Sequence, residues 1–163
     1  MIRFFKRVLR MLQAAHMPSW LRVILLNKSG YDIDSTALIR SGIRFYVSDL
    51  QMETGSFLGN NCALYSSVRF PCKVIIGQNS KIAPEVVFCG STHEIGTPNC
   101  RAGKVFNKDI VIGDGCWVGT RSILLPGVTI GSGSIIAAGA VVASNIPENE
   151  LWGGVPAKKI RSL

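Results

Sequence analysis

One histidine stands in a setting that suits proton transfer. His93 lies near the start of a segment, 89–111, that differs in pattern from the rest of the chain, and His16 is the only other histidine. An imidazole with a free pKa of about 6.5 can accept a proton near neutral pH, as a general base must. Either the carboxylate of Glu94 or a backbone carbonyl would orient the ring. His93 is therefore a candidate base, and the ordinary alternative is a solvated or structural histidine.

The same residue types argue against a metal centre. A zinc site needs about three histidine or cysteine ligands at close spacing, and the two histidines lie far apart in sequence. The odd number of cysteines contains no C-x-x-C pair. They are Cys62, Cys72, Cys89, Cys100 and Cys116. We therefore expect no metal and reduced thiols, which are typical of a cytoplasmic protein.

Large apolar residues recur every six positions through the body of the chain. One run is Leu58, Leu64, Phe70, Ile76, Ile82 and Phe88, and a second is Ile112, Val118, Leu124, Ile130, Ile136 and Val142. The runs share one phase, because 112 − 88 = 24 is four sixes. A weaker set, Ile33, Ile39 and Phe45, precedes a one-residue slip. These fifteen hexads, at about three per coil, predict about five coils of a parallel β-helix.

Smaller residues repeat in step with the large ones. Glycine follows the large residue at Gly59, Gly77, Gly113, Gly119 and Gly131. Small or β-branched residues come four positions after it, at Cys62, Val68, Val86, Cys116, Ser122, Val128, Ser134 and Ala140. We expect these to fill a narrow interior, with glycine tolerating the turns. The period excludes an α-helix, and a β-sandwich would show less regular turns.

The repeat divides the chain into parts. Segment 89–111 breaks the pattern, with Glu94 where a large apolar residue would keep the phase, so we expect a loop extruded from residues 31–147 of the β-helix. Such loops tend to be functional. Residues 1–30 lack the six-residue period, and their apolar residues recur at helical spacing. We expect a first helix near the start of this segment and a second short helix over 21–26, which together form a helical cap. Residues 148–163 are expected to form a C-terminal tail.

Charge is concentrated at the two ends. The chain has 18 Lys+Arg against 10 Asp+Glu, a net charge of +8. Residues 1–30 carry six basic residues and no acid, and Lys158, Lys159 and Arg161 follow near the end, which leaves 18 − 6 − 3 = 9 basic residues against 10 acidic ones. A near-neutral body argues against a nucleic-acid groove. No apolar run of about 18 residues predicts a membrane span, and we read no signal peptide.

The chain resembles a known family in the order and spacing of its motifs. The strings are STH at 91–93, IGDGCWVG at 112–119, LPGVTIG at 125–131, AGAVV at 138–142 and GGVPAK at 153–158. They are similar to the hexapeptide-repeat acetyltransferases, and most similar to the maltose and galactoside O-acetyltransferase group. The resemblance covers roughly residues 55–163. It implies a mainly β fold, a left-handed parallel β-helix, assembled as a homotrimer.

The resemblance also implies a mechanism. Acetyl-CoA would lie in a groove between neighbouring subunits, and His93 would remove a proton from an acceptor hydroxyl that attacks the thioester directly. Glu94 is one candidate to orient the imidazole. A backbone N–H near Gly119 would stabilise the oxyanion.

Further positions follow from the family's pattern. Trp117 matches a tryptophan near the acetyl end of the cofactor, and Gly119, Thr120 and Ala138 match backbone positions along its groove. The basic trio Lys158, Lys159 and Arg161 matches residues near the CoA phosphates. The chain departs from the family at Ala143-Ser144, where Thr-Lys is common, and at the acceptor asparagine, where Tyr65 stands with Asn60 and Asn61 close by.

These departures bear on the substrate. We expect O-acetylation of a sugar hydroxyl, in a surface polysaccharide or its precursor, by a cytoplasmic enzyme. The alternatives are a non-sugar acceptor, such as an antibiotic hydroxyl or serine, and a non-catalytic β-helix scaffold. The basic N-terminus fits a peripheral contact with the inner face of a membrane. A solvated helix face or packing within a trimer explains it as well.

Overall fold

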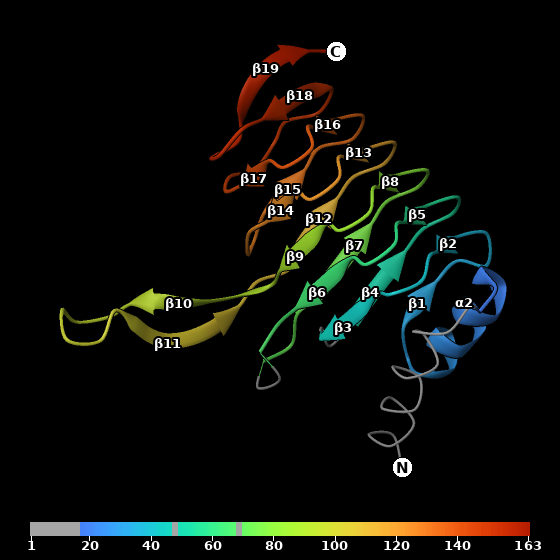
Figure 1. Cartoon of the computed structure of the whole chain (residues 1–163), viewed down its shortest axis with the longest axis horizontal. Helices are drawn as coiled ribbons and strands as arrows, with labels where there is room; N and C mark the ends of the chain where they lie inside the picture. Colours follow the sequence, from blue (N-terminus) through green and yellow to red (C-terminus); the bar gives the residue numbers. More distant parts are fainter. Residues whose placement is uncertain (1–16, 47–48, 68–69) are drawn as a thin grey trace.

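The chain winds into a stack of coils (Figure 1). The structure is a computed structural model that describes residues 17–46, 49–67 and 70–163. Short strands alternate among three sheets, each named here by its first strand. The β1 sheet contains β1 (Asp32–Ile33), β4 (Asp49–Met52), β7 (Lys73–Ile76), β12 (Ile110–Ile112) and β15 (Thr129–Ile130). The β2 sheet contains β2 (Leu38–Ile39), β5 (Phe57–Leu58), β8 (Lys81–Ile82), β13 (Trp117–Val118), β16 (Ile135–Ile136), β18 (Glu150–Gly153) and β19 (Lys158–Ser162).

The third side completes the coil. The β3 sheet contains β3 (Arg44–Tyr46), β6 (Ala63–Tyr65), β9 (Val87–Cys89), β14 (Ile123–Leu124) and β17 (Val141–Val142). Within the three sheets the strands pair in parallel, except that β19 folds back antiparallel on β18. Three strands make one coil, so β1–β9 and β12–β17 make five coils. This confirms the parallel β-helix that the six-residue period predicts.

The interior is a ladder of large apolar side chains stacked in register. Met52 pairs with Ile76, Ile76 with Ile112 and Ile112 with Ile130, one from each successive coil. Each of these four is at most 1% exposed. Because successive residues of a strand point to opposite faces, the two-residue strands bury one side chain and leave its neighbour outside.

One predicted interior position is wrong. Phe70 is 37% exposed and lies outside the stack, whereas Met52, which the periodic run omits, is buried in it. Between β6 and β7, the described residues 66–67 and 70–72 belong to a loop, and the phase is preserved because 76 − 64 = 12 is two sixes. Pro71, in this loop, lacks the N–H that a ladder position requires. The count of fifteen hexads holds because Met52 takes the place of Phe70.

The small interior residues are confirmed where the structure describes them. Cys62, Val86, Cys116, Ser122, Val128, Ser134 and Ala140 are all buried, and Val68 lies outside the described residues. The buried serines do not leave their hydroxyls unpaired. Ser122 Oγ donates to the Gly119 carbonyl at 2.8 Å, and Ser134 Oγ donates to the Pro147 carbonyl at 2.7 Å. The narrow corners therefore hold hydroxyls at little energetic cost.

The glycine after each large residue has a different reason from the one predicted. A Cβ on Gly119 would lie 2.5 Å from the backbone nitrogen of Ala138 and 2.7 Å from the carbonyl oxygen of Ile136. Glycine is required there because the next coil approaches too closely for a side chain. The left-handed backbone conformation occurs elsewhere in the corners, for example at Gly115 with φ +64°.

Helix α2 (Ser19–Lys28) covers the first coil. Val23 and Leu26 are buried against the stack, and the Asn27 side chain bonds both the N–H and the carbonyl of Ile33 at the edge of β1. These contacts satisfy backbone groups that an open edge leaves unpaired. The helix expected over 21–26 is confirmed, and the one expected within residues 1–16 lies outside the described residues. No helix in the described part of the chain is long and apolar enough to cross a bilayer.

Candidate active site

His93 lies on a hairpin that projects from the stack (Figure 1). The segment that interrupts the hexads forms two antiparallel strands, β10 (Ser91–Ile95) and β11 (Ala102–Asn107). They leave the coil after β9, at the corner between the β3 sheet and the β1 sheet. The excursion is therefore an ordered hairpin, with His93 opposite Val105 on its partner strand.

A backbone carbonyl engages one nitrogen of the His93 ring. Nδ1 lies 2.8 Å from the carbonyl oxygen of Gly103, across the hairpin. A carbonyl can only accept, so Nδ1 carries the proton in this contact and Nε2 is left with its lone pair. Glu94, the other candidate to orient the ring, is exposed and has no recorded hydrogen bond or ion pair with the described residues. The geometry thus leaves Nε2 free to accept a proton.

The cofactor candidates of the central coils line a single groove. Trp117, Gly119, Thr120 and Ala138 border a cavity of about 350 Å³ on the β2 sheet, which Leu151 of β18 also lines. The groove is mainly apolar, and the Trp117 ring is 57% exposed beside it. The amide of Gly119 donates to the Ile136 carbonyl at 2.8 Å and is not available to a ligand.

The basic residues near the C-terminus lie beyond this groove on the same sheet. Lys158, Lys159 and Arg161 are exposed on β19, the edge strand next to β18. They do not border the groove. Lys159 Nζ lies 2.5 Å from a carboxylate oxygen of Glu150, and this contact, followed by the Trp152 indole, lowers the pKa of Glu150. Lys158 and Arg161 have no such acidic partner among the described residues.

The hairpin and the groove occupy different sides of the same chain. His93 projects from the corner after β9, whereas the groove runs along β13 and β16, and no hairpin residue lines it. One chain therefore does not bring the imidazole to the groove.

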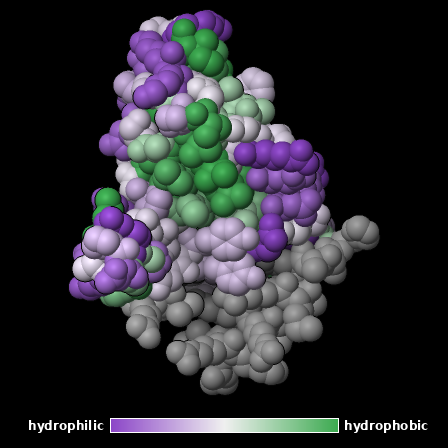
Figure 2. Space-filling model, turned by 60° about the vertical axis from the view of Figure 1, so that its left-hand side comes forward, coloured by the Kyte–Doolittle hydropathy of each residue, from purple (hydrophilic) through white to green (hydrophobic). Residues whose placement is uncertain are grey.

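The face beside the hairpin is apolar. Figure 2 shows a hydrophobic strip along the stack. On the β3 sheet, the outward-facing Val87, Ile123 and Val141 lie in register on successive coils and are only partly exposed. Such a strip is typical of a surface that another protein covers.

The acceptor candidates do not form one cluster. Tyr65 stacks on Tyr46 with ring centroids 5.4 Å apart, and its carbonyl accepts from the Gly90 amide at the base of the hairpin. Asn60 instead bonds Ser41, near helix α2. Asn61 has φ 59°, a turn conformation that asparagine tolerates. Only Tyr65 of the three lies at the hairpin.

Sequence reasoning missed two residues at the hairpin. Gly103 supplies the carbonyl for His93, and Asn107, at the end of β11, donates its amide to the carbonyls of Ser67 and Phe70 at 3.0 and 2.7 Å. Asn107 thereby ties the loop between coils to the hairpin. Neither residue belongs to the hexad pattern, and no local motif marks them. In the described part of the chain, no three His, Cys, Asp or Glu side chains are arranged to hold a metal ion.

Comparison with known proteins defines the class. The bacterial transferase hexapeptide family (six repeats) matches residues 109–144. An acetyltransferase of Vibrio cholerae O1 biovar eltor that contains hexapeptide repeats, solved with acetyl-CoA, superposes with a TM-score of 0.75 at 24% identity, over 99% of this chain and 87% of that one. A maltose O-acetyltransferase of Clostridium difficile 630 gives 0.73 at 25% identity, over 99% and 85%. The chain has the left-handed β-helix fold of these hexapeptide-repeat proteins.

Its sequence relatives include proteins named as acetyltransferases. It is 38% identical to the galactoside O-acetyltransferase of Escherichia coli (strain K12) over 90 residues, 55% of this chain and 44% of that protein. It is 29% identical to E. coli WcaF, whose name assigns it to acetyl transfer in colanic acid biosynthesis, over 86% of this chain and 74% of that protein. The chain thus spans less than half the length of the galactoside enzyme. The chain is similar to galactoside and maltose O-acetyltransferases.

Proposed function

We propose that the protein is an acetyl-CoA-dependent O-acetyltransferase. The observation that carries the proposal is the state of His93, whose Nδ1 is held by a carbonyl while Nε2 stays available on an exposed hairpin. A groove of suitable apolar character on the β2 sheet would take the pantetheine arm, with Trp117 near the acetyl group. The solved relative that contains acetyl-CoA supports this choice of co-substrate.

The reaction would proceed by direct transfer. Nε2 of His93 takes the proton of an acceptor hydroxyl as its oxygen attacks the carbonyl carbon of the thioester. The C–S bond then breaks, and the imidazolium returns the proton to the CoA thiolate, so the products are an acetyl ester and CoA. The Gly103 carbonyl orients the ring, with Glu94 as the alternative. An amide next to Gly119, such as that of Thr120, would stabilise the oxyanion.

The site would be completed by a second copy of the chain. His93 and the groove lie on different sides of one protomer, so we propose a trimer in which the hairpin of one subunit covers the groove of its neighbour. The apolar strip of the β3 sheet supports such packing. The basic Lys158 and Arg161 would meet the CoA phosphates at the open end of the groove, with Lys159 held by Glu150.

Mixing two inactive variants tests the shared site. His93→Ala removes the base, and Thr120→Trp blocks the groove. Co-expressed subunits should form mixed trimers in which some sites pair an intact hairpin with an intact groove, so part of the transfer activity returns. Mixing the two variants after separate assembly, without subunit exchange, is the control. If both halves of the site came from one subunit, co-expression would recover nothing.

For the acceptor, we propose a sugar hydroxyl in a surface polysaccharide or its precursor, modified in the cytoplasm. The similarity to WcaF and to the galactoside enzyme supports a sugar, and Tyr65 beside the hairpin offers an aromatic surface, with Asn60 and Asn61 further away. CoA release measured against panels of sugars, aminocyclitol antibiotics and serine tests this choice. Release with serine or an antibiotic, and with no sugar, would overturn it.

A further inference from the structure

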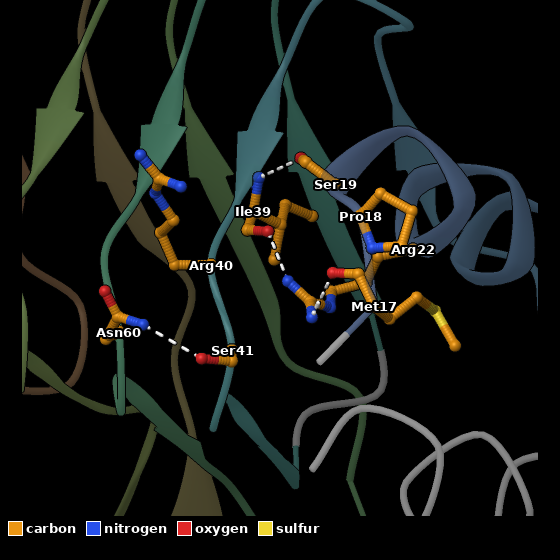
Figure 3. A pocket seen from close by; sticks show the side chains of 8 residues that line it. All are labelled: Met17, Pro18, Ser19, Arg22, Ile39, Arg40, Ser41 and Asn60. Carbon is orange, nitrogen blue, oxygen red and sulfur yellow. Dashed lines mark hydrogen bonds between the residues drawn. The ribbon is translucent and has the colours of Figure 1, made fainter. Parts of the chain in front are cut away.

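A second cavity lies at the opposite end of the stack from the C-terminal strands. It has a volume of about 460 Å³ and separates the start of helix α2 from the turns that follow β2 and β5 (Figure 3). Ser19 and Arg22 line it from the helix, and Arg40, Ser41 and Asn60 line it from the coils. It is separate from the groove on the central coils, which shares no residue with it.

A buried arginine forms the inner wall of this cavity. Arg22 is 2% exposed, and its guanidinium donates to the carbonyls of Ile39 and Met17. Its Nε is buried and has no hydrogen-bond partner among the residues that the structure describes. Figure 3 shows the guanidinium held between these two carbonyls, on the side of α2 that faces the coils. Two carbonyl contacts satisfy N–H groups but leave the positive charge uncompensated.

No acidic side chain neutralises that charge from the cavity wall. The described residues that line it include a second cation, Arg40, and no aspartate or glutamate. Burial first, and then the charge of Arg40, lowers the pKa of Arg22. The sequence from residue 1 to residue 31 also contains no acid. A negative charge that balances the Arg22 guanidinium must therefore come from residues after position 31 or from a bound ligand.

The remaining polar groups have donors to spare. Ser41 Oγ accepts from the Asn60 amide at 2.9 Å, and Ser19 Oγ accepts from the Ile39 amide at 2.9 Å. Neither hydroxyl donates to another described residue, so each keeps a proton that it can donate to a ligand. Helix α2 starts at the same place, and its first turn contains no acidic residue. A helix N-terminus of this kind favours a negative charge. The two hydroxyl groups can donate to a ligand oxygen, and the helix N-terminus attracts negative charge. Together they suit a ligand with negatively charged oxygen atoms.

We propose that this cavity binds a phosphate-type oxyanion between Arg40, Ser41 and the start of helix α2. The buried charge of Arg22 attracts the anion, and the hydroxyl of Ser41 contacts it. The exposed guanidinium of Arg40, which lies over the Phe57 ring in this structure at 5.7 Å from the ring centroid, turns toward the cavity to contact the anion as well. The same chemistry fits a soluble phosphorylated ligand and the headgroup of an anionic lipid. The site is independent of acetyl transfer, and it is tested without any activity measurement.

The probe is inorganic phosphate, titrated into the full-length protein at constant ionic strength. Calorimetry should give saturable binding, and phosphate should raise the melting temperature. Arg40→Gln should weaken the affinity by about tenfold, as the loss of one charge-assisted contact does. Ser41→Ala should weaken it less. Arg44→Gln is the matched control, because Arg44 is also exposed and lies outside the cavity, and its substitution removes the same charge.

Vesicles identify the source of the phosphate. If a lipid headgroup is the ligand, the protein should co-sediment with phosphatidylglycerol vesicles and not with phosphatidylcholine vesicles. Arg40→Gln should then reduce co-sedimentation with phosphatidylglycerol vesicles more than Arg44→Gln does. Binding of phosphate without co-sedimentation identifies a soluble ligand. The proposal is overturned if phosphate shows no saturable binding, or if the two arginine variants lose affinity equally, which would mean a diffuse basic surface.

Discussion

His93 and Gly103 face each other across the hairpin, with the ring Nδ1 2.8 Å from the carbonyl oxygen. This contact fixes the tautomer with a main-chain group, whose position depends on the pairing of β10 with β11. An ionised side chain is not required for it. The orientation of the His93 ring therefore depends on the pairing of the two hairpin strands as much as on which side chains lie next to it.

Replacing Gly103 should harm transfer more than replacing Glu94. A Cβ at position 103 would lie 2.8 Å from the Glu94 carbonyl, so Gly103→Ala must shift the strand and its carbonyl. We expect turnover to fall about tenfold, the size of loss that misplacement of a catalytic group produces. Glu94→Gln should stay within about twofold of the wild type, since the Gly103 contact persists. A larger loss in Glu94→Gln than in Gly103→Ala would assign the orienting role to Glu94.

Two glycine variants should separate crowding from backbone strain. Gly119→Ala places a Cβ 2.5 Å from the backbone of the next coil, and we expect a loss of about 3 kcal/mol in the free energy of unfolding. Gly115→Ala meets no atom within 4 Å and suffers only its positive φ, a cost of about 1 kcal/mol. Denaturant titration measures both. Equal losses would mean that the stacked coils yield easily at Gly119.

The thiols should differ sharply in reactivity. Burial raises the pKa of Cys62 to about 11, and burial with the charge of Asp109 raises that of Cys72 to about 11, whereas Cys100 is exposed on the hairpin. At pH 8, a thiol reagent should label Cys100 quickly and the two buried thiols only after unfolding. Rapid labelling of Cys62 in the native protein would contradict the packed interior.

The same shifts predict a loss of stability in alkali. The unfolded thiols ionise near their ordinary pKa of 9.0, whereas the folded Cys62 and Cys72 stay protonated to about pH 11. The contribution of the two thiols to the free energy of unfolding is therefore fully present below pH 9, and it is lost as the pH rises from 9 towards 11. Cys62→Ala should flatten the alkaline decline measured by thermal unfolding, after its own cavity cost at neutral pH is subtracted.

The C-terminal basic residues should act on CoA binding through charge. Reversal of Lys158 and Arg161 to glutamate should weaken CoA affinity by more than about tenfold at low salt, with a smaller effect at high salt. Reversal of Arg3 and Lys6 changes the net charge by the same amount and should leave the affinity unchanged. Equal effects of the two pairs would mean that the net charge, and not position, attracts CoA.

Much of the fold was predictable because a β-helix places a large apolar residue in its interior at every sixth position of the sequence. Met52 and Phe70 mark the limit of that signal. Each is a large apolar residue, and only the path of the chain between coils decides which one is inside. The close approach behind Gly119 is likewise a contact between coils, which the local sequence does not record.

The candidate site could be proposed from its residue types, whereas its arrangement could not. His93 stands out because it breaks the hexads, and the groove residues follow from the family's motif. The Gly103 carbonyl is a main-chain group and has no signature. In the sequence, Arg22 is one of the six basic residues of the N-terminal segment, and nothing there distinguishes it from a surface charge. It is nevertheless buried, because its guanidinium donates to two carbonyls where the helix meets the coils.

The central claim is that His93 is the base of an acetyl transfer. The most direct measurement compares His93→Ala with the wild type, recording acetyl-CoA affinity and acceptor-dependent CoA release on the same preparations. We predict unchanged acetyl-CoA affinity and a loss of turnover of about 10²- to 10⁴-fold, the contribution of a general base. Unchanged turnover in a folded His93→Ala protein would contradict the account.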